Sequence, residues 1–114
     1  MNAPPLQPLR VSQGWTMAYN SALYELDPDP SQVPAKERWW IFKCDMLQMK
    51  HARYDRMLDL GWSPEGDLTA GSYKLVLYAG DFNGTLLHTF RSRDRAALVA
   101  EIERLLAAVT RGEL

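Results

Sequence analysis

The sequence predicts an α+β domain in the order ββαβββα, with an antiparallel or mixed sheet of about five strands and two helices. Several short segments alternate apolar and polar residues with the period of two that is typical of strands. One C-terminal segment carries a one-sided apolar stripe with helical spacing. The chain has 114 residues, of which 46% are hydrophobic and 24% charged. This length and composition are typical of a single globular domain.

The N-terminal part is predicted to form an extension followed by a β-hairpin. Residues 1–8 are rich in proline, which indicates a flexible extension, and residues 9–114 are expected to form the domain. Alternating residues between Leu9 and Leu26 indicate two strands. The segment Asp27–Ser31 ends the second strand, because its two prolines cannot donate to a strand ladder.

The segment that begins near Ser31 or Val33 and ends near His51 is predicted to be a helix with two apolar faces. One face contains Trp39, Phe42, Met46 and Met49, with Lys43 and Lys50 at its border. The opposite face contains Val33, Trp40, Cys44 and Leu47. A surface helix needs only one apolar stripe, so this helix is either enclosed within its domain or presents one face to another chain.

Three further strands are predicted after this helix. Residues Arg53–Trp62 alternate, although a continuation of the helix to Gly61 is the alternative for residues 53–60. Residues Tyr73–Ala79 are apolar on both faces, which indicates a central strand. The Asn-Gly pair within residues 80–84 predicts a hairpin turn, and the return strand is residues 85–91.

The second helix is predicted between Ser92, as the N-cap, and Gly112, as the residue that follows the C-cap. Asp94 in its first turn interacts favourably with the helix dipole, because a negative charge is stabilised near a helix N-terminus. Its apolar stripe consists of Leu98, Val99, Ile102, Leu105, Leu106 and Val109.

Composition and charge exclude several classes of protein. The net charge of −1 gives no overall field that would attract nucleic acid or anionic membranes. A single cysteine excludes an intramolecular disulfide and a multi-cysteine zinc site. No apolar run reaches the roughly 18–20 residues of a membrane span, and the N-terminus has no signal-peptide pattern. We therefore expect a cytoplasmic protein with no membrane partner.

No catalytic, metal or cofactor site is predicted. Cys44 lies on an apolar helix face, which indicates a buried small side chain. Cys44 and His51 would lie about 10 Å apart along a helix, too far for a nucleophile and its base. His88 lies among apolar neighbours on a strand, as a packed histidine does. Phosphate-binding loops and nucleophile motifs are absent from the sequence.

Two alternative functions remain open. Asp59, Glu65 and Asp67 flank one predicted loop and could act as an acid–base pair or hold Mg²⁺, which would make the protein a small enzyme. Basic residues concentrate in residues 50–56 and 91–95, which would suit a small RNA-binding module. Interleaved acidic residues and the slightly negative net charge argue against nucleic acid as the partner.

The two-faced helix leads to a different hypothesis, that of a binding surface. Its residues are most simply core, because methionine and aromatic residues at helical spacing usually pack inside a domain. The functional interpretation leaves one face exposed to bind a protein partner or a second copy of the chain as a homodimer. The predicted contact residues are Trp39, Phe42, Met46 and Met49, with Lys43 and Lys50 at the rim.

The sequence also resembles a known group of proteins over residues 9–106. The segments that carry the resemblance are WWIFKCDMLQMK, RMLDLGWSPEGD, GSYKLVLY and LLHTFRSRDRAALVAEIERLL. They are similar to small single-domain bacterial immunity proteins of polymorphic and contact-dependent toxin systems. The resemblance implies a non-catalytic protein that binds and blocks one cognate toxin domain, and it implies no catalytic residues.

Overall fold

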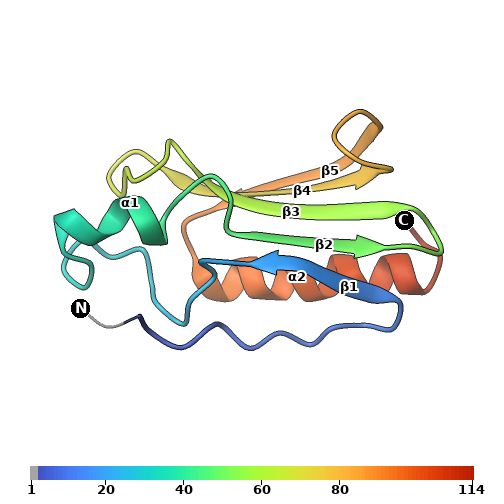
Figure 1. Ribbon diagram of the computed structural model, residues 1–114, viewed down its shortest axis with the longest axis horizontal. Coiled ribbons are helices and arrows are strands. Elements are labelled where there is room, and N and C mark those ends of the chain that lie inside the picture. Colours follow the sequence, from blue (N-terminus) through green and yellow to red (C-terminus); the bar gives the residue numbers. More distant parts are fainter. Residues whose placement is uncertain (1–2) are drawn as a thin grey trace.

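The computed structural model of the chain describes residues 3–114 and contains one antiparallel sheet with two helices (Figure 1). The five strands lie side by side in their order along the chain. They are β1 (Trp15–Asn20), β2 (Leu47–His51), β3 (Arg56–Ser63), β4 (Ser72–Ala79) and β5 (Thr85–Ser92). The helices are α1 (Arg38–Ile41), which follows a 3₁₀ turn (Ala35–Glu37), and α2 (Arg95–Thr110). The predicted α+β fold with a sheet of five strands and two helices is confirmed.

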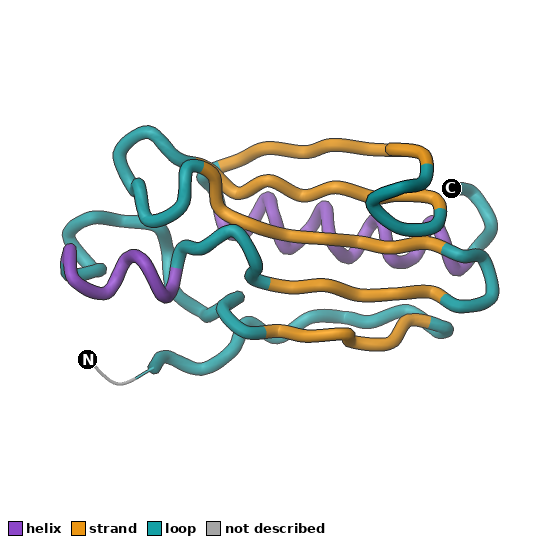
Figure 2. The backbone as a smooth tube through the Cα atoms, turned by 45° about the horizontal axis from the view of Figure 1, so that its top comes forward, coloured by secondary structure: helices purple, strands orange, loops and turns teal. Residues whose placement is uncertain are grey.

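Helix α2 covers one face of the sheet, which we call the inner face (Figures 1 and 2). Asp94 begins the helix, because its carboxylate accepts hydrogen bonds from the backbone N–H groups of Ala96 and Ala97. Asp94 therefore takes the N-cap position that the sequence assigned to Ser92. Gly112 follows the helix with a φ of 75°, as predicted for a glycine after the C-cap.

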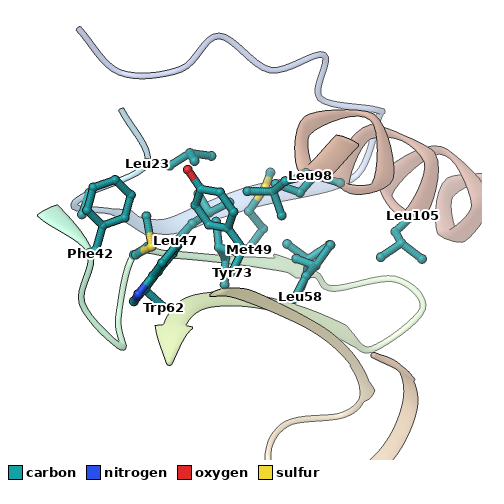
Figure 3. Packing of buried hydrophobic residues seen from close by; sticks show 14 of the residues in the cluster. Leu23, Phe42, Leu47, Met49, Leu58, Trp62, Tyr73, Leu98 and Leu105 are labelled. Atoms are coloured by element: carbon teal, nitrogen blue, oxygen red, sulfur yellow. The ribbon is translucent and has the colours of Figure 1, made fainter. Parts of the chain in front are cut away.

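The core lies between α2 and the inner face. Strand residues of alternating position point toward α2, and Leu98 and Leu105 of the helix meet them (Figure 3). Trp62 packs edge-on against Phe42 and Tyr73, with ring centroids 4.9 and 5.0 Å apart. This aromatic group closes the end of the core that α2 leaves uncovered, beside the loop that follows α1.

The long helix predicted for residues 33–51 does not form. Only α1 is α-helical in this segment, and residues 47–51 form strand β2. Between them, the chain joins the end of β3: Met46 N donates to Leu60 O at 3.0 Å, and Trp62 N donates to Lys43 O at 2.9 Å. Ile41, Phe42, Met46 and Met49 of this segment pack into the core, and this tertiary packing overrides local helical preference.

The N-terminal segment also differs from its prediction. Residues 9–11 are not a strand, and residues 5–7, predicted as part of a flexible extension, are hydrogen bonded to the domain. Gln7 N donates to Leu23 O at 2.9 Å, and Glu25 N donates to Pro5 O at 2.8 Å. This segment runs alongside α2, where Arg10 N donates to a carboxylate oxygen of Glu103 at 2.7 Å. Met1 and Asn2 of the predicted extension lie outside the described residues.

Candidate functional site

The face of the sheet opposite α2, which we call the outer face, carries no helix (Figure 2). One row of cross-strand neighbours crosses all five strands on this face. The row consists of Tyr19, Gln48, Asp59, Val76 and Thr89. A charged residue, Asp59 of the central strand β3, therefore lies near the middle of the uncovered face.

Two loops rise at opposite ends of the outer face. The loop between α1 and β2 lies directly on Gly61, where a Cβ atom would be 2.1 Å from the carbonyl oxygen of Cys44. At the other end, the turn between β4 and β5 folds over the outer face (Figure 2). Its Phe82 contacts Tyr78 edge-on, with ring centroids 5.4 Å apart. The two loops therefore enclose the part of the face around Asp59.

Two adjoining cavities occupy this enclosed area, and we call them together the Asp59 cleft. The first has a volume of about 260 Å³ and is lined by Asp59, Gly61, Lys74, Tyr78 and Phe82, among others. The second has a volume of about 360 Å³ and is lined by Tyr19, Ser21, Lys43, Asp45, Gln48 and Phe82. Phe82 borders both cavities, and Tyr19 and Gln48 of the second cavity bind Asp59 of the first.

The Asp59 carboxylate is half-buried at the floor of the cleft. Gln48 Nε2 donates to Asp59 Oδ1 at 3.3 Å, and the Tyr19 hydroxyl donates to the same oxygen at 3.4 Å. Burial raises the pKa of Asp59 above its ordinary value, and the hydrogen bond from Gln48 only partly offsets this effect. The negative charge of Asp45 raises the pKa of Asp59 further.

Two neighbouring groups are held in their protonated forms. Burial, followed by the charges of Asp59 and Asp45, raises the pKa of Tyr19 to about 12. Desolvation and the charges of Asp45 and Glu65 raise the pKa of the Cys44 thiol. The Cys44 side chain is exposed, whereas the sequence predicted it to be buried. A raised pKa lowers the thiolate fraction of Cys44 and with it the nucleophilicity of this side chain.

The structure does not gather the predicted contact residues on one surface. Phe42, Met46 and Met49 are each only 1% exposed, because they pack into the core instead of lining one side of a helix. Trp39 is 68% exposed and lies on α1, outside the cleft. Lys43 lines the second cavity of the cleft.

The last member of the predicted contact set, Lys50, is also separated from the others. It is exposed on β2 and lines a different cavity together with Thr16 and Arg56. The set is therefore divided between the core, α1 and the outer face.

The loop carboxylates of the alternative enzyme hypothesis do not converge. Glu65 accepts a hydrogen bond from Cys44 N at 3.3 Å, and Asp67 stabilises its own turn by accepting from Thr69 N and Ala70 N. Asp59 lies on β3, within the strand predicted for residues 53–62. Within residues 3–114, no group of three or more His, Cys, Asp or Glu side chains is placed to hold a metal ion.

The histidines occupy structural positions. His51 is buried between Trp15 and Tyr54, stacked on the Tyr54 ring at 5.2 Å, and its Nδ1 accepts from Tyr54 N. His88 Nε2 lies 2.7 Å from a carboxylate oxygen of Glu101 on α2, which agrees with the predicted bonded ring nitrogen, and its side chain is 31% exposed.

Sequence reasoning missed most of the cleft, including Tyr19, Gln48, Lys74, Tyr78 and Phe82. A signal was present in the alternation of residues 73–79, which places Lys74, Val76 and Tyr78 on one face. The same alternation in residues 57–62 places Asp59 on one face of its strand. To predict that the two sets of residues share one face of the sheet, the register between the strands must be known, and the sequence pattern does not supply it.

Comparisons with protein-family models, curated proteins and solved structures find no significant match to this chain. In the part of the chain that the structure describes, no helix has the length and apolar character needed to cross a membrane.

Proposed function

We propose that this protein binds a protein partner through its outer face and acts by occluding that partner, without catalysis of its own. The observation that carries the proposal is that one face of the sheet has no covering layer and holds a half-buried carboxylate between two aromatic side chains, Tyr19 and Tyr78. A protein that needed this face only for stability would gain by placing apolar residues on it and covering them.

The composition of the outer face supports an interface. Met57 and Val76 lie beneath the surface of this face and are only 2% and 7% exposed, respectively. Phe82 supplies the aromatic side chain that a partner can reach, since it is 56% exposed. Apolar and aromatic anchors at the centre of a patch, with polar groups that fix orientation, are typical of protein–protein interfaces.

The resemblance to immunity proteins suggests the biological role of this binding, which is to block a toxin. An immunity protein in the bacterial cytoplasm needs only to cover the active surface of one toxin domain, and a protein with one uncovered sheet face and no reaction of its own suits that task. A second copy of the chain is the alternative occupant of the same face, since a twofold axis would let one patch serve both subunits.

The proposal is tested by capturing partners from the lysate of the source organism with the tagged wild type and two variants. Phe82→Ala removes an exposed ring beside the cleft, and Trp39→Ala removes an exposed ring from α1. We expect a stoichiometric partner, identified by mass spectrometry, that binds the wild type and Trp39→Ala and is lost with Phe82→Ala. Circular dichroism checks that both variants fold.

The opposite capture result would place the partner-binding site elsewhere on the protein. Retention by Phe82→Ala together with loss by Trp39→Ala would place the partner on α1, near the surface that the sequence predicted. Capture of the chain alone, with a dimer mass that Phe82→Ala reduces to that of the monomer, would make a second copy the partner.

A second candidate function is a small enzyme that uses Asp59 as a general acid or base. Its supporting observation is that burial raises the pKa of a carboxyl group lying in a cavity. A screen of metabolites and divalent metals by thermal shift tests it, because a ligand of the native state raises the melting temperature. A ligand that stabilises the wild type but not Asp59→Asn would favour the enzyme.

RNA binding finds less support in the geometry. Lys50, Lys74 and Arg91 give the outer face basic side chains, but the carboxylates of Asp59 and Asp45 occupy its centre and repel phosphate. An affinity for single-stranded RNA that falls steeply with salt would restore this alternative.

A further inference from the structure

The Asp59 carboxylate lacks a positive partner within the domain. Among residues 3–114 it forms no ion pair, and its two hydrogen-bond donors, Gln48 and Tyr19, are both neutral. The charged neighbour that acts on it, Asp45, has the same sign. A half-buried charge without compensation is costly, and proteins normally neutralise such a charge with an opposite one.

The space beside Asp59 has a shape and lining that suit a cation on a narrow stem. Gly61, two residues from Asp59 on the same face of β3, lines the cavity of about 260 Å³ together with Asp59, and the backbone of Cys44 packs over it. Tyr78 and Phe82 form one wall of this cavity, and Tyr19 lies on the opposite side of Asp59. Aromatic rings attract cations through their faces, and they also pack on apolar stems.

Lys74 also lines this cavity but does not satisfy the carboxylate. Its Cα is paired with those of Gly61 and Arg91, and its side chain is exposed. Lys74 thus lines the cavity without forming an ion pair with Asp59 in the described part of the chain. A metal ion is a poor occupant, because Asp59 is a single carboxylate and, in the described part of the chain, no second or third acidic ligand joins it.

From this geometry we propose that the Asp59 cleft receives a lysine or arginine side chain of the protein partner, whose charged head pairs with Asp59 while its stem packs between Phe82 and Tyr78. This inference rests on the proposed function, since it names the group by which the partner is recognised at the outer face. A charge pair formed in a partly desolvated cleft gives specificity for that partner, because a neutral side chain would leave Asp59 uncompensated.

The inference is tested by NMR titration of the ¹⁵N-labelled chain with three probes of equal stem length, n-butylammonium, n-butylguanidinium and n-butanol. The two cations are expected to give saturable shifts at the Gln48 side-chain amide and at the Asp59 and Phe82 backbone amides, whereas butanol gives none. Asp59→Asn should weaken cation binding at least about tenfold, which corresponds to about 1.4 kcal/mol.

Asp81→Asn is the matched control. It makes the same change in charge on the turn that carries Phe82, and its residue lines a different cavity from that of Asp59. It should leave the cation affinity unchanged. Equal shifts with butanol, or equal cation affinity in Asp59→Asn, would overturn the inference.

Partner capture with Asp59→Asn separates this inference from the proposed function. Loss of the partner with Asp59→Asn and with Phe82→Ala supports both. If Phe82→Ala loses the partner and Asp59→Asn retains it, the outer face is still the interface, but the inference of a cationic side chain in the cleft is overturned. Cation binding by the cleft without any effect of Asp59→Asn on the partner would assign the cleft to a free small amine and would overturn the inference as well.

Discussion

The two faces of the sheet are made from alternate residues of the same strands, yet they differ in almost every property. On β3, Leu58, Leu60 and Trp62 face α2 and are fully buried, whereas Asp59 and Gly61 face outward. The inner face meets a helix whose apolar stripe matches it (Figure 3). The outer face meets two loops that enclose a cleft around an uncompensated carboxylate.

The inner face of the sheet thus stabilises the fold, and we propose that the outer face of the same sheet binds the partner. Apolar burial between α2 and the inner face provides the main favourable term of folding. The outer face can then hold a feature that costs free energy, such as the half-buried charge of Asp59. Native proteins accept such costs where a site requires them. Substitutions on the inner face should therefore mainly lower the free energy of unfolding, whereas substitutions on the outer face should mainly weaken partner binding.

The largest effect is expected from Trp62→Ala on the inner face. Trp62 is fully buried, packs against Phe42 and Tyr73, and donates through its indole N–H to Asp67 O at 2.9 Å. Its removal should lower the free energy of unfolding by about 3–5 kcal/mol through lost burial and a cavity. Urea unfolding followed by circular dichroism measures this change.

Trp39→Ala is the control for that experiment, because the same substitution is made at a residue that is 68% exposed. It should change the free energy of unfolding by no more than about 0.5 kcal/mol. Similar losses in the two variants would contradict the division between buried and exposed tryptophans.

The next effect concerns Gly61, the outward-facing neighbour of Trp62 on β3. Gly61→Ala would place a methyl group 2.1 Å from the backbone oxygen of Cys44, and backbone atoms cannot give way as a flexible side chain can. We expect a loss of about 1–3 kcal/mol from overpacking, together with amide shifts in residues 43–46. Urea unfolding and NMR measure the two changes.

Thr89→Ala serves as the comparison, since Thr89 is exposed in the same cross-strand row as Asp59. Its effect should stay within about 0.5 kcal/mol. If Gly61→Ala is equally mild, the loop between α1 and β2 does not rest on β3 as tightly as the structure indicates.

A smaller, pH-dependent effect is expected at Glu101, the acidic residue of α2 that meets the inner face. Its hydrogen bonds to Arg104, and then that to His88, lower its pKa from the ordinary 4.5. A lowered pKa in the folded state gives stability that is present above pH 4.5 and is lost as the pH falls through the folded-state value. Glu101→Gln should therefore cost about 1 kcal/mol at pH 7.

Urea unfolding of wild type and Glu101→Gln at several pH values tests this account. The difference between them should shrink as the pH falls below 4.5. Glu25→Gln, at an exposed position, is the control. A difference that stays constant with pH would mean that packing, and not the charge of Glu101, carries the effect.

The sequence predicted best those elements whose local pattern agrees with their tertiary surroundings. The stripe of α2 faces one layer only, so its spacing reveals both the helix and its buried side. The turn at residues 80–84 and the two strands around it follow from turn chemistry and alternation, which are local properties. The bonded ring nitrogen of His88 was also predicted.

The prediction failed for residues 33–51 because the buried residues of this segment belong to a short helix, a loop and a strand. Phe42 packs on Trp62, Met46 donates its N–H to Leu60 O, and the following residues enter the sheet. The combined spacing of these buried residues resembles that of helical stripes, so periodicity alone does not distinguish one long helix from a short helix, a loop and a strand. The predicted contact residues do not share one surface for the same reason. The cleft depends on a strand register that no local pattern reveals.

The smallest expected change in stability, and the one of opposite sign, is that of Asp59→Asn in the cleft. The pKa of Asp59 is raised in the folded state, so its contribution to stability is fully present below the ordinary value of 3.8 and is lost as the pH rises through the folded-state value. Asparagine avoids the buried charge and keeps an oxygen that can accept from Gln48. At pH 7 the variant should be more stable by about 0.5–1 kcal/mol, a gain of the size that removal of an unfavourable surface charge provides.

Thermal unfolding at pH 7 and at pH 3.5 distinguishes this charge effect from a packing effect. The gain should be present at pH 7 and should largely vanish at the lower pH, where wild-type Asp59 is also protonated. A loss of stability at pH 7 would show that the domain itself compensates the Asp59 charge. A gain in stability together with a loss of cation binding in the same variant would show that the outer face retains this carboxylate for recognition and not for folding.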